Sequence, residues 1–224
     1  MRIRLMETPL AVPRYRQVRM PTVAAEFTPF AEVTINDENV EPVDLSPTDL
    51  VGFTAQPYNV GRAIHLARGF RAQGVKTIIG GPHATTMRER LLEHFDAVVV
   101  GEVEGLGERI CSDFERGKLA GLYENERAPD LSQCRLPRRD LQRAESYYTV
   151  NFPIELTRGC PHRCSFCYGP YGFPTFRTRP LDNIAADLDQ WDHGYVEAVD
   201  MHFAADRLHL LEVCRLLEAR RVWG

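Results

Sequence analysis

Residues 49–117 alternate short apolar segments with amphipathic ones, and this alternation constrains the fold more than any other feature. The apolar run 49–54 ends in small residues and suits a buried strand. Residues 59–72 carry apolar side chains at helical spacing, and Gly74 is suited to end that helix. Other segments fit the same scheme, as strands at 3–6, 32–35, 75–79 and 97–100 and as helices at 22–27, 86–94 and 104–116. The alternation predicts βαβ units in a doubly wound parallel sheet.

Three loops follow the expected strands at their carboxyl ends, where doubly wound sheets bind ligands. They are residues 54–57, 80–85 and 101–104. Gly80 and Gly81 would let a ligand approach the backbone closely, which makes them candidate cofactor-binding residues. The alternative is that they only form a tight strand-to-helix turn. The sequence has neither a G-x-G-x-x-G motif nor a P-loop, so nucleotide binding in those styles is not expected.

Residues 118–150 break this rhythm and are expected to be a linker between two α/β domains. The segment has little periodicity, and its charged residues 138–140 are interpreted as solvated. The first domain would cover residues 1–117 and the second residues 151–224. The second domain continues the alternation, with strands at 153–157 and 197–203 and helices at 180–193 and 206–220.

A cluster of cysteines, Cys160, Cys164 and Cys167, follows the first strand of the second domain in the spacing C-x3-C-x2-C. Three thiolates from one loop suit a soft metal centre. They are one fewer than a closed zinc site or a fully ligated four-iron cluster requires, so one coordination position would be open. The carboxyl end of a strand is also where a βα barrel has its active site. An alternative is a structural zinc site, with His162 as the fourth ligand.

Composition indicates a soluble globular protein in a reducing compartment. The 224 residues are 44% hydrophobic and 26% charged. A net charge of −4 gives no electrostatic case for nucleic acid or an anionic membrane. The sequence has no run of about 18 apolar residues, and its N-terminus does not resemble a signal peptide. We therefore expect a cytoplasmic protein without a membrane span, whose clustered cysteines are metal ligands or redox groups rather than disulfides.

The cysteine motif, with Phe166 before its last cysteine, resembles the signature of the radical S-adenosylmethionine (radical SAM) superfamily. In that superfamily the three cysteines bind three irons of a [4Fe–4S] cluster, and the fourth iron holds S-adenosylmethionine. One-electron reduction then yields a 5′-deoxyadenosyl radical that abstracts hydrogen from the substrate. The resemblance implies an enzyme with a small-molecule substrate and a low-potential electron donor such as flavodoxin or ferredoxin. Its cluster ligands would be Cys160, Cys164 and Cys167.

The first domain narrows the resemblance to radical SAM proteins with an N-terminal cobalamin-binding domain. The segments 49–54, 80–85 and 101–104, in this order before the cysteine loop, are similar to that group. It includes methyltransferases that act on unactivated carbon and the anaerobic Mg-protoporphyrin ester cyclase. The implied fold is a cobalamin-binding-like parallel sheet followed by the first part of a radical SAM (βα) barrel. Cobalamin is thus a further candidate cofactor, and because the motif D-x-H-x-x-G is absent, its cobalt would lack that histidine as a lower ligand.

The resemblance also assigns roles to residues after the cluster motif. Phe166 and Tyr168 would pack around the cluster and adenine, with a purely structural role as the alternative for Tyr168. Arg177 and Arg179 match a basic stretch of the relatives, and the alternative is that they are exposed charges. Asp206 lies where relatives contact the methionine amino group of S-adenosylmethionine. Relatives often have two adjacent acids there, whereas this chain has an alanine before Asp206.

The second domain is short for a radical SAM barrel. Residues 151–224 supply two βα units and the start of a third, whereas an eight-unit barrel needs about 250 residues. We therefore expect a truncated barrel. The chain would be a fragment of a longer protein, the product of a truncated reading frame, or a chain that must pair with another. Two functional hypotheses follow beside the zinc alternative. One is a radical SAM enzyme, a cobalamin-dependent methyltransferase or cyclase-like, and the other is a catalytically inactive corrinoid and Fe–S binding module.

Overall fold

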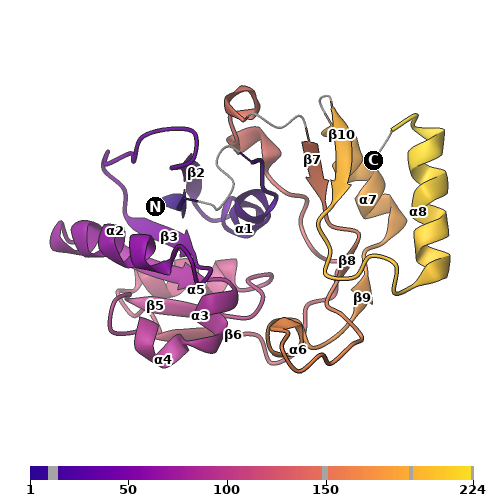
Figure 1. Cartoon of the computed structure of the whole chain (residues 1–224). Helices are drawn as coiled ribbons and strands as arrows, with labels where there is room; N and C mark the ends of the chain where they lie inside the picture. The colour runs from indigo at the N-terminus through magenta and orange to yellow at the C-terminus, as the bar shows by residue number, and fades with distance from the viewer. Residues whose placement is uncertain (10–14, 148–150, 192–193, 223–224) are drawn as a thin grey trace.

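The first half of the protein contains a six-stranded parallel sheet (Figure 1). The computed structural model describes residues 1–9, 15–147, 151–191 and 194–222. The strands are β1 (Arg2–Glu7), β2 (Glu32–Asp37), β3 (Leu50–Thr54), β4 (Lys76–Gly80), β5 (Ala97–Val100) and β6 (Leu122–Glu124). Their spatial order is β2-β1-β3-β4-β5-β6, and every neighbouring pair is parallel. The expected doubly wound parallel sheet is confirmed.

Helices cover both faces of this sheet, which explains why its strands are apolar on both sides. The helices α1 (Arg19–Phe27) and α5 (Gly107–Glu115) pack on one face. The other face is covered by α2 (Val60–Ala72), α3 (Pro82–Thr86) and α4 (Arg88–Leu91). Successive strand residues alternate between the two cores, as Ile78 and Ile79 do in β4. Parallel strands buried in this way bring their carboxyl ends to one edge of the sheet, where the loops gather.

Several element bounds differ from those expected. The helix expected at 86–94 is two short helices, α3 and α4, because the chain turns into a helix directly after Gly81. The helix expected at 104–116 begins only at Gly107, because Gly101 and Gly105 adopt positive φ angles of +74° and +80° and form a loop. Strand β6 lies within the range expected to be a linker and extends the sheet by one strand.

The second half contains β7 (Asn151–Ile154) and β10 (Tyr195–Ala198), which pair in parallel with α7 (Leu181–Leu188) between them in the chain. This is a βα unit of the expected type, and α8 (Arg207–Ala219) follows it. A second, antiparallel pair joins β8 (Thr157–Arg158) to β9 (Arg177–Thr178), with the short α6 (Gly169–Gly172) between them. The core is formed by Phe152, Ile154, Leu156, Ile184, Leu188, Val196, Val213 and Val222.

The strand expected at 197–203 ends at Ala198. The chain leaves the sheet there because the Asp200 carboxylate turns back to the end of β7, where it accepts a hydrogen bond from the Leu156 amide at 3.0 Å. It also accepts bonds from the amide of Thr157 and, at 2.7 Å, from its hydroxyl. Burial raises the pKa of Asp200, whereas the hydrogen bonds from Leu156 and Thr157 act to lower it. Asp200 thus fixes the turn into the cysteine loop.

The segment between the halves includes two 3-10 turns, η1 (Arg139–Leu141) and η2 (Ala144–Ser146). Arg139 was expected to be solvated, and this is wrong. Its side chain is buried, with Nε 2.7 Å from Oδ1 of Asp187 and the guanidinium carbon 3.9 Å from the centre of the Phe152 ring. Arg179, for which exposure was an alternative, is buried too, with Nη1 2.7 Å from Oδ2 of Asp187. A buried carboxylate in α7 therefore gathers both arginines.

In the part of the chain that the structure describes, no helix combines the length and the apolar character that a bilayer crossing requires.

Glu7 is buried at the carboxyl end of β1, beside Asp37 of β2. Burial raises the pKa of Glu7 from 4.5 to about 7, Arg19 opposes this shift, and Asp37 adds to it. Between these two pH values the folded protein keeps a proton that the unfolded chain has released. The free energy of unfolding should therefore fall as the pH rises through this window and level off above it.

We expect Glu7→Gln to remove this contribution to the pH dependence. Urea unfolding at pH 5 and pH 8 should show that the variant gains stability relative to the wild type as the pH rises, by up to about 3 kcal/mol. The same pH dependence in both proteins would show that Glu7 titrates normally in the folded state.

Candidate functional site

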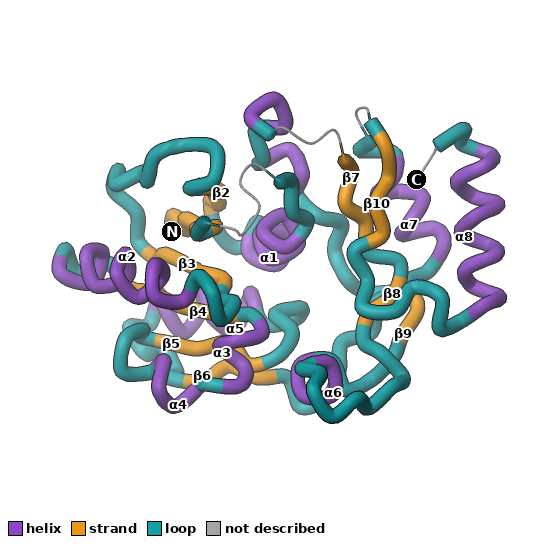
Figure 2. Tube along the Cα trace, in the orientation of Figure 1, coloured by secondary structure: helices purple, strands orange, loops and turns teal. Residues whose placement is uncertain are grey.

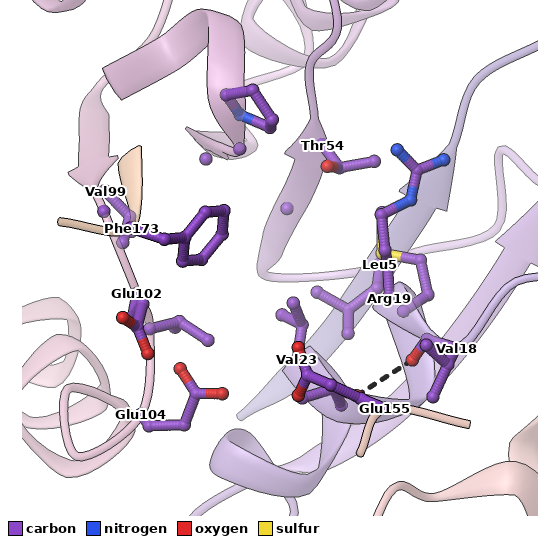
Figure 3. Close-up of a pocket in the computed structure, with 18 of the residues that line it drawn as sticks. Leu5, Val18, Arg19, Val23, Thr54, Val99, Glu102, Glu104, Glu155 and Phe173 are labelled. Atoms are coloured by element: carbon purple, nitrogen blue, oxygen red, sulfur yellow. Dashed lines mark hydrogen bonds between the residues drawn. The ribbon is translucent and has the colours of Figure 1, made fainter. Parts of the chain in front are cut away.

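A cavity of about 310 Å³ lies between the carboxyl edge of the parallel sheet and the second half (Figure 3). Figure 2 shows that the loops after the strands of the first half face the region of β8 and α6. The first half contributes the Thr54, Gly80–Pro82 and Gly101–Glu104 regions to the wall. The second half contributes Thr157 to Gly159, Phe173 and Met201, among others. The cavity therefore lies at the edge where doubly wound sheets bind ligands.

The inner part of this cavity is an apolar slot between the sheet and α1. On the sheet side it is lined by Ile3, Leu5, Leu50, Gly52, Ile78 and Val99, and on the helix side by Met20, Val23 and Phe27. Gly52 keeps this region open, since a Cβ at that position would lie 2.8 Å from Cδ2 of Leu5. An apolar slot of this kind suits a flat, poorly hydrated group rather than a charged one.

The wall is charged where the two halves meet. Glu102 and Glu104 follow β5, and both are buried against Arg158 of β8. Burial raises the pKa of Glu104, while Arg158 opposes that shift. For Arg158, burial favours the neutral form, but the surrounding carboxylates outweigh it and raise its pKa well above the ordinary value. The arginine is therefore a fixed positive charge at this wall.

Gly80 and Gly81, the candidate cofactor-binding glycines, both line the cavity. They also form a tight turn, as the alternative interpretation required. Gly81 has a φ of +97°, and a Cβ there would lie 2.9 Å from Oγ1 of Thr54 and 3.0 Å from the carbonyl oxygen of Ala55. The Thr85 hydroxyl donates to the Gly81 carbonyl at 3.1 Å and accepts from the Gly101 amide at 2.9 Å, which joins two of the wall loops. Contact with a cofactor stays a prediction for both glycines.

Gly81→Ala is expected to destabilise the first half by about 1–3 kcal/mol, through backbone strain and the contacts with Thr54 and Ala55. Gly74→Ala is the matched control, because Gly74 has a similar φ of +80° but no atom within 4 Å of the added Cβ. Urea unfolding of both variants separates the cost of the backbone strain from the cost of the close contacts. Equal losses would mean that the wall loop tolerates the added methyl group.

The cysteine loop begins directly after β8. Gly159 has a φ of +83°, and a Cβ there would lie 2.3 Å from the Thr175 carbonyl oxygen, so only glycine fits this close backbone approach. Cys164 is exposed, and Cys160 and Cys167 are half-buried. The Cys167 amide donates to the Cys164 carbonyl at 3.0 Å, and the Cys167 sulfur accepts from the Gly169 amide at 3.3 Å. Amide donors of this kind stabilise thiolate ligands and tune Fe–S centres.

The donor set of the loop fits an Fe–S cluster in chemistry. It supplies three soft sulfur atoms, which suit iron–sulfur clusters, from one short solvent-accessible segment. Among the described residues, no three His, Cys, Asp or Glu side chains converge on one metal position, so the thiols are close in the chain but not gathered. His162, the fourth ligand in the zinc alternative, instead stacks on His202 with ring centroids 5.1 Å apart.

The other predicted cofactor residues occupy three different settings. Phe166 is 92% exposed. Tyr168 is half-buried, with its ring edge-on to Phe173 at 6.4 Å, and burial raises its pKa. Asp206 caps α8, since its Oδ1 accepts from the amides of residues 208 and 209 at 3.0 and 3.1 Å. None of these three is part of the described lining of the cavity, in contrast to Gly80 and Gly81.

Sequence reasoning missed two side chains that shape the site. Asp200, which also lines the cavity, was hidden inside an expected strand. Arg158 was read only as part of the segment before Cys160, although it binds Glu102 and Glu104. A usable signal was the pair of glutamates two residues apart in an expected ligand loop, because buried carboxylates need a cationic partner.

The chain is similar to a curated methyltransferase in sequence and to a solved methyltransferase in fold. No protein-family model matches the chain. Bacteriochlorophyllide d C-12(1)-methyltransferase of Chlorobaculum tepidum is 30% identical over 174 residues, which cover 74% of this chain and 38% of that protein. The radical S-adenosylmethionine methyltransferase TsrM of Kitasatospora setae, solved with tryptophan and a SAM analogue, has a TM-score of 0.79 at 19% identity. A TsrM structure with cobalamin and a [4Fe-4S] cluster has a TM-score of 0.75 at 16% identity.

The coverage of these comparisons is uneven. The two TsrM alignments cover 98% of this chain but only 51% and 52% of TsrM. The chain thus spans about half of TsrM and 38% of the Chlorobaculum tepidum protein. Both halves of this chain, in their observed arrangement, are therefore shared with one solved fold.

Proposed function

We propose that the chain belongs to the radical SAM superfamily, among the members with a cobalamin-binding-type first domain, and that it binds a [4Fe–4S] cluster and S-adenosylmethionine next to a corrinoid. The reaction class is methyl transfer or a related cyclase-like reaction on a small molecule. One observation carries the proposal: Thr157, Arg158 and Gly159, which lead directly into the cysteine loop, line the same cavity as the sheet edge of the first half. A chain with two adjacent cofactors needs this arrangement.

Cys160, Cys164 and Cys167 are the proposed cluster ligands, because they supply three thiolates and leave one iron for S-adenosylmethionine. With an electron from a low-potential donor such as flavodoxin or ferredoxin, a cluster held in this way supplies radical or methyl-transfer chemistry. The exposed ring of Phe166 can pack on the adenine. Tyr168 packs edge-on against Phe173, which lines the cavity.

Asp206 is the least supported member of the proposed cofactor site. One of its carboxylate oxygens already caps α8 through two backbone amides. A contact with the methionine amino group would have to use the other oxygen. The cap also fixes the position of the carboxylate after β10, which favours its use as a ligand if the cosubstrate reaches it.

The apolar slot supports corrinoid binding in the first half. The whole cavity has a volume of about 310 Å³, at the lower end of small-molecule sites, so the slot can hold a flat nucleotide base but not a whole corrinoid. Gly80 and Gly81, which also line the cavity, would then contact the macrocycle. We keep the division into residues 1–117, 118–150 and 151–224 as part of the proposal, with β6 extending the first sheet to Glu124.

A corrinoid and Fe–S binding module without turnover is the second candidate. It is favoured by the small parallel sheet of the second half, where the described residues form two strands. Both candidates predict the same cofactors and differ only in reactivity.

An anaerobic assay separates these candidates. The chain is reconstituted with iron and sulfide, incubated with hydroxocobalamin and freed of unbound cofactor by gel filtration. S-Adenosylmethionine and dithionite are then added, and 5′-deoxyadenosine and S-adenosylhomocysteine are measured. Retained iron, sulfide and cobalamin with formation of either product supports the enzyme, and retained cofactors without products support the binding module. A wild-type chain that retains neither iron nor cobalamin contradicts the proposed function.

A further inference from the structure

Arg158 lies between the parallel sheet and the cysteine loop. It is the last residue of β8, two positions before Cys160, and its side chain is 8% exposed. The next residue, Gly159, packs its backbone tightly against Thr175, with a Cβ at Gly159 only 2.3 Å from the Thr175 carbonyl oxygen. The position of the Arg158 backbone therefore determines where the loop starts.

Three carboxylates surround the guanidinium of Arg158. Its Nη1 lies 2.7 Å from Oε2 of Glu102 and 2.6 Å from Oε1 of Glu104. Its Nη2 lies 2.6 Å from Oε2 of Glu155. Glu102 and Glu104 are 56 and 54 residues earlier in the chain and belong to the first half. One planar guanidinium thus connects both halves, which a lysine ammonium would do with fewer bonds.

Arg177 strengthens the same connection from the neighbouring strand. It faces Arg158 in the β8–β9 ladder. Its Nη2 lies 2.5 Å from Oε1 of Glu102, and its Nη1 donates to the Pro129 carbonyl at 2.6 Å. Both carboxylate oxygens of Glu102 are therefore held by arginines of the second half.

The loop that carries the two glutamates is itself held in place. Gly101 and Gly105 give it two positive φ angles. The Gly105 amide donates to Oε2 of Glu26 in α1 at 3.0 Å. Asn125 donates to the backbone carbonyls of both glutamates, each at 2.9 Å. Because both ends of the ion-pair network are fixed, the network holds the glutamate loop and β8 at a fixed distance from each other.

We propose that Arg158 is a positioning residue that sets the distance between the cysteine loop and the cavity wall through Glu102 and Glu104. The inference rests on the proposed function, because this distance matters only if the loop holds one cofactor and the cavity another. Glu102, Glu104, Glu155 and Arg158 all line the cavity that the two cofactors would share, and Figure 3 shows the three carboxylates around it.

Amide hydrogen exchange on the full chain tests the positioning without any cofactor. In Arg158→Ala, exchange should rise at least about tenfold in residues 101–105 and 159–167, the factor expected for the loss of one hydrogen bond to a charged group. Exchange in β3 and β4 should not change. Arg158→Lys should lie between Arg158→Ala and the wild type, and Arg163→Ala, which removes an exposed arginine of the same loop, should match the wild type.

Two exchange results would overturn the proposal. One is wild-type exchange in both loops of Arg158→Ala. The other is a loss of protection throughout the sheet in Arg158→Lys as well as in Arg158→Ala, which would mean that Arg158 supports folding in general.

A second measurement tests the cofactor distance itself. Electron paramagnetic resonance (EPR) on reconstituted protein reports the magnetic coupling between the reduced cluster and cob(II)alamin. Arg158→Lys should keep the iron and sulfide content of the wild type but show an altered coupling. An unchanged coupling contradicts the proposal. If the wild type binds neither cofactor, the proposed function fails, and the exchange experiment still decides whether Arg158 fixes the loop.

Discussion

Cys164→Ala is expected to lower the bound iron and labile sulfide of the reconstituted chain by more than about tenfold, since even the loss of an outer-sphere partner typically costs a metal site 10- to 100-fold. The visible charge-transfer absorption should disappear with them. The physical reason is that the motif offers only three thiolates for a cluster that already leaves one iron to a cosubstrate. A second missing ligand would leave two irons without protein sulfur.

Cys214→Ala is the matched control for this experiment. Cys214 is also an exposed thiol, but it lies on α8 outside the motif. It should keep the iron, the sulfide and the absorption of the wild type. If both variants lost iron equally, or if Cys164→Ala kept its cluster, the assignment of the motif as the cluster site would be wrong. Zinc in place of iron would support the structural zinc site.

Asp187→Ala should produce the largest loss of stability, about 3–5 kcal/mol in the free energy of unfolding. Asp187 is fully buried and pairs with Arg139 and Arg179, whose side chains are 2% and 10% exposed. Its removal leaves two buried guanidinium groups without a counter-charge. The variant should therefore loosen the contact between η1 and the second half. Urea unfolding, followed by far-UV circular dichroism, measures the effect.

Asp189→Ala is the control for this second prediction. Asp189 lies two residues later and pairs with Arg220 at 3.3 Å, but its side chain is 70% exposed. Water screens an exposed pair, so the loss should stay below about 1 kcal/mol. Similar losses in both variants would show that the buried network contributes no more than a surface ion pair.

The parallel sheet of the first half could be predicted from sequence because its signals are local. Segments such as 49–54 and 59–72 have the length, the periodicity and the Gly74 stop that define a strand and a helix. Element starts were less accurate where a loop precedes a helix. The helix after β5 begins at Gly107 because Gly101 and Gly105 take positive φ angles, which the pattern of apolar residues does not report.

The ion-pair networks could not be predicted, because their partners are far apart in the chain. Arg139 and Asp187 are separated by 48 residues, and Arg158 and Glu102 by 56. Each looks like an ordinary surface charge in its own segment. Only the docking of the two halves removes them from water and makes the pairing necessary.

The candidate site was predictable where residue chemistry is specific and less so where geometry decides. The cysteine motif assigns cluster ligands by spacing, and this assignment is still a prediction. Gly80 and Gly81 line the cavity, whereas Phe166 and Asp206 lie outside its described lining. The role of Asp206 depends on the start of α8, where its carboxylate caps the helix. A sequence pattern does not show that such an oxygen is already in use.

The central claim is that the three cysteines hold a [4Fe–4S] cluster whose fourth iron is open to S-adenosylmethionine. EPR of the reduced, reconstituted wild-type chain, with and without S-adenosylmethionine, tests it most directly. We predict about four irons and four sulfides per chain and a cluster signal that shifts when S-adenosylmethionine is added. A chain that binds zinc instead of iron, or a cluster signal that S-adenosylmethionine leaves unchanged, would contradict it.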